Sequence, residues 1–245
     1  MPERHVVTIG VSGPSSSGKT TLARHLEKIL PNAVIVHQDD FFKPESDIPI
    51  DPTTKLFNWD CPSALDLPSF VRVLRHVHAE GTLPSSYESK EDRNEPTKNA
   101  VAVSEERLTV FRERVREMLG ENGDDDWAFV IVDGFMLYYH EDVMRELDAR
   151  VFVRSSYEVL KRRREARKVY ATIEGYWADP PGYFDAIVWP EYLKWNQHLF
   201  ESADGLGTLH PDVKDLLILD SSDLSVDDIV ELSLEAVRAA VERNW

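Results

Sequence analysis

The sequence has one cysteine, no long apolar run and an excess of acidic over basic residues. Cys61 is the only cysteine among 245 residues, so no internal disulfide can form, as is usual for proteins of a reducing compartment. No apolar stretch reaches membrane-spanning length, and Met1–Gly10 lacks the basic start and apolar block of a signal peptide. We therefore expect a cytoplasmic protein that does not bind membranes.

The charge balance is the second limit on function. The chain carries 28 lysines and arginines against 44 aspartates and glutamates, which gives a formal charge of −16. Binding to duplex nucleic acid needs a basic footprint, so we expect no nucleic-acid partner. A local arginine cluster could still hold a small anionic ligand. Hydrophobic residues make up 42% of the chain, which is enough for a globular core.

Short apolar segments alternate with amphipathic ones along the chain. We predict strands at Val6–Val11, Ala33–Val36, Ala128–Val132, Arg150–Val153 and Leu216–Leu219. We predict helices at Thr20–Leu30, about Ser69–Ala79, Ser104–Leu119, Tyr157–Lys168 and Val226–Val241. Such alternation is typical of α/β proteins with a parallel sheet covered on both faces. We expect one α/β domain over residues 1–245, with a five-stranded parallel sheet, a lid at about 161–182 and an insertion at about 85–126.

A phosphate-binding loop follows the first predicted strand. The segment GPSSSGKT, Gly13 to Thr20, matches G-x-x-x-x-G-K-[ST], with an apolar strand before it and an amphipathic helix after it. Its glycines allow backbone N–H groups to surround an anion at the positive end of the helix. Lys19 should reach the β- and γ-phosphates, and the Thr20 hydroxyl should bind Mg²⁺. The loop predicts binding of a nucleoside triphosphate.

This loop also occurs in switches and motors, so it does not define the function alone. A GTPase switch would need a guanine-reading [NT]-K-x-D segment, and neither Thr54-Lys55 nor Thr97-Lys98 has the aspartate two residues later. The D-x-x-G segment Asp179–Gly182 contains two prolines and does not follow an apolar strand. A kinase is therefore favoured, and a non-catalytic nucleotide-dependent switch is the alternative from another class.

Aspartates follow the predicted strands at the edge where ligands bind in open parallel sheets. Asp133 follows the third strand, where phosphate-loop enzymes place an acidic group for Mg²⁺. Asp39 is the first acid after the second strand and is our candidate to orient the acceptor hydroxyl and take its proton. We expect its neighbour Asp40 to support or cap the turn, and Asp60 in the segment NWD lies near the same edge.

The only dense basic run is KRRREARK, Lys161 to Lys168. Arg163 and Arg167 are four positions apart and should share a helix face, with Arg164 on a neighbouring one. Arginines stabilise the charge that develops during phosphoryl transfer. The alternative is a solvated helix face, the usual meaning of a charge run.

Taken in order, these segments resemble the nicotinamide riboside kinases, a family of the uridine-kinase-like and phosphoribulokinase-like group. The shared blocks are GPSSSGKTT, HQDDFFKPE, NWDCPSALD, VDGFMLY, YEVLKRRREARKVY and DPPGYFDAIVWPEYLKWN, which cover Val6 to Asn196. The resemblance implies a P-loop NTPase kinase fold and an Mg²⁺-dependent transfer from ATP, with GTP as a conceivable second donor. The acceptor would be the 5′-hydroxyl of nicotinamide riboside, or of nicotinic acid riboside, in NAD salvage.

The resemblance also implies roles for individual positions. The residues on ATP would be Gly13, Pro14, Ser15, Ser16, Ser17, Gly18, Lys19, Thr20, Thr21, Arg163 and Arg167. The metal would be held by Thr20, Asp39 and Asp133. The riboside would be lined by Asp39, Asp40, Phe41, Phe42, Trp59, Asp60, Arg164, Tyr170, Ala171, Thr172 and Asp179. We expect a small-molecule partner only, and a monomer or weak oligomer.

Trp59 and Tyr170 would sandwich the pyridine ring of the riboside. Aromatic faces attract a cationic pyridinium by about 0.5–2 kcal/mol, although both residues could instead be plain core aromatics. Two positions depart from the family pattern. Asp133 stands where many relatives carry glutamate, so its shorter arm would reach Mg²⁺ through water, and Ala171–Ala178 is longer than in compact relatives. A uridine or cytidine kinase remains the nearest alternative.

Overall fold

The computed structural model describes residues 4–90, 102–120, 123–167, 170–172, 175–202, 204–205 and 207–244. Its centre is a five-stranded sheet in the order β2-β3-β1-β4-β7, and every neighbouring pair is parallel. The strands are β1 (His5–Ser12), β2 (Ala33–His37), β3 (Trp127–Asp133), β4 (Ala149–Arg154) and β7 (Leu217–Asp220). The predicted fold class and all five predicted strands are confirmed.

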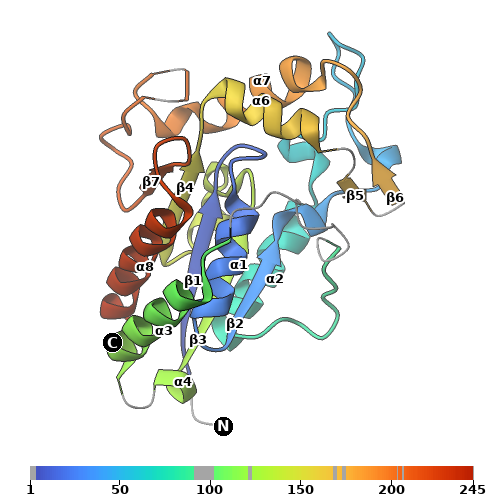
Figure 1. The fold of residues 1–245 in the computed structure, drawn as a ribbon. Helices are drawn as coiled ribbons and strands as arrows, with labels where there is room; N and C mark the ends of the chain where they lie inside the picture. Colours follow the sequence, from blue (N-terminus) through green and yellow to red (C-terminus); the bar gives the residue numbers. More distant parts are fainter. Residues whose placement is uncertain are drawn as a thin grey trace.

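Helices cover both faces of this sheet (Figure 1). One layer contains α1 (Lys19–Ile29), α3 (Glu105–Leu119) and α8 (Val226–Arg243), and the other contains α2 (Leu67–Glu80), α5 (Glu141–Met144) and α7 (Trp189–Asn196). The strand pleat explains this division, because successive side chains point to opposite faces. In β3, Phe129 and Ile131 pack with the first layer, whereas Val130 and Val132 pack with the second.

A third group of elements lies above the carboxyl ends of the strands, at the top of Figure 1. It contains α6 (Tyr157–Ala166), the antiparallel hairpin of β5 (Tyr170–Thr172) and β6 (Gly175–Trp177), and a π-helical turn at Phe184–Val188. Its apolar cluster joins Leu160, Tyr183 and Ile187 to Trp59. Short 3-10 turns occur at Gln38–Phe41, Glu45–Asp47, Pro62–Ala64, Leu137–Tyr139 and Gln197–Leu199.

The sequence analysis placed the end of α6 too late. The helix ends at Ala166, and Arg167 has an extended backbone with φ −83° and ψ 120°. The prediction that Arg163 and Arg167 share a helix face through their four-residue spacing is therefore wrong. The sequence pattern did not indicate the end of the helix, because the charge run contains no glycine or proline. Lys168 lies outside the described residues.

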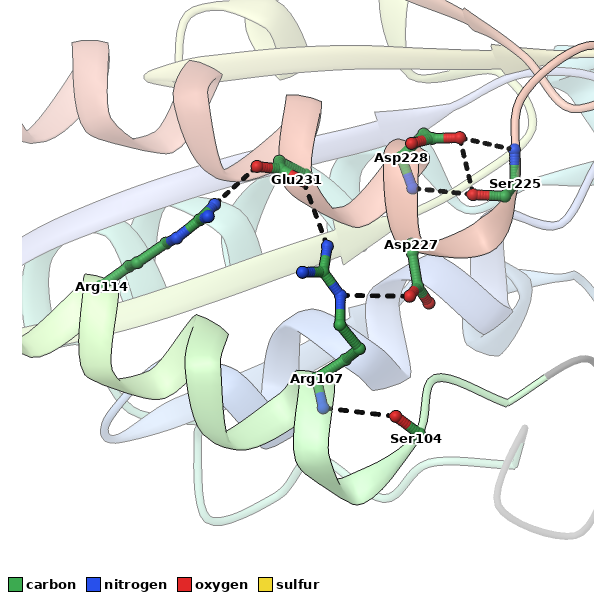
Figure 2. A network of polar contacts seen from close by, with 7 residues as sticks. All are labelled: Ser104, Arg107, Arg114, Ser225, Asp227, Asp228 and Glu231. Atoms are coloured by element: carbon green, nitrogen blue, oxygen red, sulfur yellow. Dashed lines mark hydrogen bonds and ion pairs between the residues drawn. The ribbon is translucent and has the colours of Figure 1, made fainter.

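Within the proposed insertion, α3 belongs to the layer that covers the sheet. Its apolar face, which includes Leu108, Phe111 and Val115, packs into the same core as α1 and α8. Figure 2 shows its polar face bound to α8: Arg107 contacts Asp227 and Glu231, each at 3.2 Å. The short helix α4 (Gly123–Asp126) connects α3 to β3. Residues 91–101 and 121–122 of the insertion lie outside the described part.

None of the helices in the described ranges is long and apolar enough to cross a membrane.

Candidate active site

The phosphate loop joins β1 to α1 at the carboxyl edge of the sheet. Gly13 has φ 135°, and a Cβ there would lie 1.9 Å from the carbonyl oxygen of Val153, so both conformation and space require glycine. Gly18 precedes α1 with φ 106°. The Lys19 ammonium donates to the Pro14 carbonyl at 2.9 Å and so lies over the loop. Burial lowers the pKa of Lys19, while the charges of Asp133 and Asp39 oppose that change.

The strand register brings the acidic residues to the same edge. Asp133 ends β3 and lies in register with His37 of β2 and Val11 of β1. Its Oδ2 accepts a hydrogen bond from the Thr20 hydroxyl at 2.7 Å and lies 3.1 Å from His37 Nδ1. Its Oδ1 is buried and has no hydrogen-bond partner within the described ranges. The Thr20 hydroxyl and the Asp133 carboxylate, one of whose oxygens is buried without a partner, form a donor set that fits Mg²⁺.

Asp39 lies on the 3-10 turn that follows β2. Asp39 is exposed, while its neighbour Asp40 is buried. Partial desolvation by the surrounding protein and the charge of Asp133 raise the pKa of Asp39, and Lys19 and Arg167 oppose the increase. A carboxylate with a raised pKa and an accessible oxygen is suited to accept a proton. The turn therefore presents Asp39 beside Lys19.

The two phenylalanines after this turn point into different environments. Phe41 packs against Phe70, with ring centroids 5.0 Å apart, and belongs to the core around α2. Phe42 instead meets Trp59 edge-on at 5.5 Å and stacks with Phe135 at 5.9 Å. A role for Phe41 in contacting the riboside stays a prediction, and Phe42 has the better position for it.

Trp59 lies inside the aromatic cluster beneath the lid. It is 6% exposed, and its indole N–H has no hydrogen-bond partner among the residues that the structure describes. Trp177 of β6 packs against it at 5.6 Å. Trp177 was missed by the sequence analysis, because a three-residue strand carries little periodic signal. The side chains of Tyr170, Ala171 and Thr172 lie outside the description, so their proposed riboside contacts stay predictions.

Asp60 is buried next to this cluster and follows the aromatic residue directly. Burial raises its pKa to about 6, with Arg164 opposing the increase and Asp179 adding to it. The hydroxyl of Tyr183 lies 3.5 Å from Asp60 Oδ2, accepts the backbone N–H of Trp59 at 3.1 Å and donates to the Phe57 carbonyl at 2.9 Å. Tyr183, another residue that sequence reasoning missed, thus holds the NWD segment in place.

Arg164 links the lid to the phosphate loop. Its guanidinium donates twice to the Asp179 carboxylate, at 2.6 and 3.1 Å, and once to the Ser15 hydroxyl at 2.7 Å. Trp177 also donates to Asp179, at 2.9 Å. Arg163 is exposed and reaches the Ser16 carbonyl at 3.4 Å. Arg163 and Arg164 therefore contact the phosphate loop, and the predicted acid Asp179 is paired with Arg164. The roles of these residues and of Arg167 in binding ATP or riboside stay predictions.

The phosphate loop and the acceptor-side residues border one small pocket. Pro14 and Ser15 line it from the loop, Asp60 and Phe135 also line it, and residues of α7 complete its wall. A group bound beside Asp60 would therefore adjoin a phosphate held by the loop. This adjacency is what direct transfer between two bound molecules requires.

A phosphate loop with a lysine, lid arginines and an accessible carboxylate at one sheet edge characterises the P-loop kinases. A family model described as an AAA domain matches residues 9–173. The nicotinamide riboside kinase of Schizosaccharomyces pombe is 35% identical over 98% of this chain and 99% of its own. That of Eremothecium gossypii is 35% identical over 97% of this chain and 95% of its own, and that of Saccharomyces cerevisiae is 34% identical over 86% of each. The chain belongs to the nicotinamide riboside kinase family.

Proposed function

We propose that this protein transfers the γ-phosphoryl group of ATP to the 5′-hydroxyl of nicotinamide riboside, giving nicotinamide mononucleotide and ADP. The observation that carries this proposal is the pocket shared by the phosphate loop and Asp60, next to the aromatic cluster of Phe42 and Trp59. A cationic pyridinium ring favours an aromatic wall. Family membership supports the same acceptor.

The phosphate loop and the lid would hold ATP. The loop from Gly13 to Thr21 would surround the phosphates at the N-terminus of α1 with its backbone N–H groups, Pro14 excepted, and the helix dipole there favours an anion. Lys19 lies over the loop through its bond to Pro14, and Arg163 and Arg167 would add positive charge from the lid. These groups stabilise the charge that develops on the transferred phosphoryl group.

Thr20, Asp133 and Asp39 would hold Mg²⁺. When bound, this ion neutralises phosphate charge and aligns the phosphoryl group. The orphaned Oδ1 of Asp133 supports the assignment, because a buried carboxylate oxygen without a partner is costly. His37 Nδ1, 3.1 Å from Asp133 Oδ2, holds the other carboxylate oxygen, so the orientation of Asp133 is set by the protein.

Asp39 would take the proton of the acceptor. The bond from the 5′-oxygen to the γ-phosphorus forms while the bond from that phosphorus to the β–γ bridging oxygen breaks. ADP leaves with the electron pair, and the hydroxyl proton passes to Asp39. Asp60 would accept hydrogen bonds from the ribose hydroxyls, and Trp59 with Phe42 would contact the pyridinium.

The test of this proposal is a product assay with a panel of nucleosides. The protein is incubated with Mg-ATP and nicotinamide riboside, nicotinic acid riboside, uridine or cytidine, and products are identified by mass. We expect a gain of one phosphoryl group on nicotinamide riboside. Phosphorylation of uridine alone would favour the pyrimidine nucleoside kinase instead, and slow ATP hydrolysis with every acceptor unchanged would favour a switch.

A further inference from the structure

The segment of residues 81–90, between α2 and the undescribed part of the insertion, is bonded to the turn that carries Asp39. None of its residues belongs to the motifs shared with the family. Tyr87 and Lys90 lie 47 and 50 positions after Asp40, yet both contact it directly. The contacts are therefore a feature of the fold that no local sequence pattern indicates.

Tyr87 contacts the turn through its hydroxyl and its ring. Its hydroxyl accepts the backbone N–H of His37 at 3.0 Å and donates to Asp40 Oδ2. Its ring lies 6.2 Å from that of Phe41, centroid to centroid. One side chain thus connects His37, at the end of β2, with Asp40 and Phe41, the two residues that follow Asp39.

Lys90 contacts the same turn through its backbone N–H and its ammonium group. Its backbone N–H donates to Asp40 Oδ1 at 2.7 Å, and its ammonium donates to the Asp40 carbonyl oxygen at 2.7 Å. Both carboxylate oxygens of Asp40 and its main-chain oxygen are therefore held by the same ten-residue segment. Asp40 is 8% exposed, and a buried carboxylate held by several donors has little freedom to move.

We propose that Tyr87 and Lys90 are positioning residues for phosphoryl transfer, acting through Asp40 on the orientation of Asp39. This inference rests on the proposed function of Asp39 as proton acceptor. The turn is fixed at one end by the pair of His37 with Asp133 and at the other by the bonds of Asp40. Asp39, which lies between them, keeps a side chain open to solvent. A shift of about 1 Å in a reacting group can cost a hundredfold in rate, so rigidity here affects catalysis.

The alternative is that these bonds stabilise the fold and do not affect catalysis. The protein supplies a matched control, because the same insertion has a second attachment: Arg107 of α3 binds Asp227 and Glu231 of α8 (Figure 2). This attachment lies on the layer of α1 and α8, away from the turn. Removing it should cost stability alone, whereas removing the bonds to Asp40 should cost turnover.

The experiment compares Tyr87→Phe, Lys90→Met and the control Arg107→Met in the full chain. We expect kcat to fall by about 5- to 50-fold in the first two variants, with KM for ATP changed less than about twofold. Arg107→Met should lower Tm by about 2–4 °C and leave kcat unchanged. Lys90→Arg should restore part of the lost kcat, because its guanidinium can still donate to the Asp40 carbonyl.

A lower Tm with unchanged kcat in Tyr87→Phe and Lys90→Met would overturn the positioning role. If the wild type phosphorylates another nucleoside, only the acceptor assignment fails, and kcat with that nucleoside tests the same role. If the wild type phosphorylates no acceptor, the proposed function and this inference fail together. Tyr87→Phe combined with Asp40→Asn gives a further check, since two groups acting on one turn should show non-additive effects on kcat.

Discussion

At the scale of single residues, the candidate site places three aspartates in different surroundings. Asp133 is buried and paired with Thr20 and His37, Asp40 is held by the segment 81–90, and Asp39 keeps an accessible oxygen. Hydrogen bonds and the neighbouring charge of Lys19 lower the pKa of Asp133 despite its burial, whereas the pKa of Asp39 is raised. The first suits a metal ligand and the second a proton acceptor.

Asp39→Asn should remove most of the turnover and leave ATP binding nearly intact. An amide cannot accept the hydroxyl proton, and general-base catalysis contributes about 10²- to 10⁴-fold, so kcat should fall by that order. Titration with a fluorescent ATP analogue measures binding separately from turnover. Asp212→Asn, on an exposed aspartate, is the control. Turnover retained within a few-fold would rule out Asp39 as the proton acceptor.

Titration of Asp60 should make both the stability of the protein and its KM for the riboside depend on pH. Burial raises its pKa from 3.8 to about 6, so the folded protein holds this proton between those values while the unfolded chain has released it. The favourable contribution to stability is therefore lost as pH rises through this window, by an amount on the order of 2 kcal/mol. An ionised carboxylate accepts hydroxyl donors better, so KM for the riboside should fall as pH rises through the folded-state pKa of about 6.

Kinetics between about pH 5 and pH 7, and urea unfolding between about pH 4 and pH 7, test the assignment of Asp60. In Asp60→Asn, we expect a higher KM for the riboside that no longer varies with pH, and greater stability than the wild type at pH 7. An unchanged pH profile in this variant would assign the titration to another group. Asp39, whose charge acts on Asp60 and whose pKa is also raised, is the carboxylate to test next.

At the scale of elements, side-chain caps stabilise the N-termini of α3 and α8, two helices of the same layer. Ser225 caps α8 in a capping box, where its hydroxyl accepts the Asp228 N–H at 3.2 Å and Asp228 accepts the Ser225 N–H at 3.1 Å. Ser104 caps α3 through a single bond of this kind, to the N–H of Arg107 at 3.3 Å. Both caps appear in Figure 2 beside the ion pairs that join the two helices.

Ser225→Ala should destabilise the protein by about 1 kcal/mol without changing kcat. Ser104→Ala is the matched comparison and should cost less, because no reciprocal side-chain bond is lost with it. Urea denaturation followed by circular dichroism measures both free energies of unfolding. Equal costs in the two variants would mean that the reciprocal bond from Asp228 adds nothing.

Some elements and site residues could be predicted from sequence, and others could not. The sequence pattern predicted the phosphate loop because the loop is one continuous motif. It predicted Asp39 and Asp133 because both lie at the ends of apolar strands. Tyr87, Lys90 and Trp177 contact residues that are far away in the chain. They were missed because a polar stretch and a three-residue strand show no hydrophobic periodicity. The extended backbone at Arg167 was missed because no helix-ending residue marks it.

At the scale of the whole molecule, strand order determines how the reacting groups meet. In the order β2-β3-β1, the ends that carry Asp39, Asp133 and the phosphate loop are neighbours. The hairpin of β5 and β6 and the helix α6 lie over this edge, and Arg164 ties them to Ser15 (Figure 1). Ligands bound at this edge would contact several elements at once, so their binding should stabilise the fold as a whole.

Mg-ATP should therefore raise Tm, and part of that increase should depend on Asp133. A ligand at a hundred times its Kd adds about 2.7 kcal/mol, which corresponds to about 5–10 °C for a chain of this size. Chelating Mg²⁺ should reduce the shift in the wild type and have little effect in Asp133→Asn, while Asp212→Asn should behave as the wild type. The shift, and not the absolute Tm, is compared, because Asp133→Asn also weakens the bonds to Thr20 and His37. An Mg²⁺-dependent shift of equal size in Asp133→Asn would show that this carboxylate does not hold the ion, directly or through water.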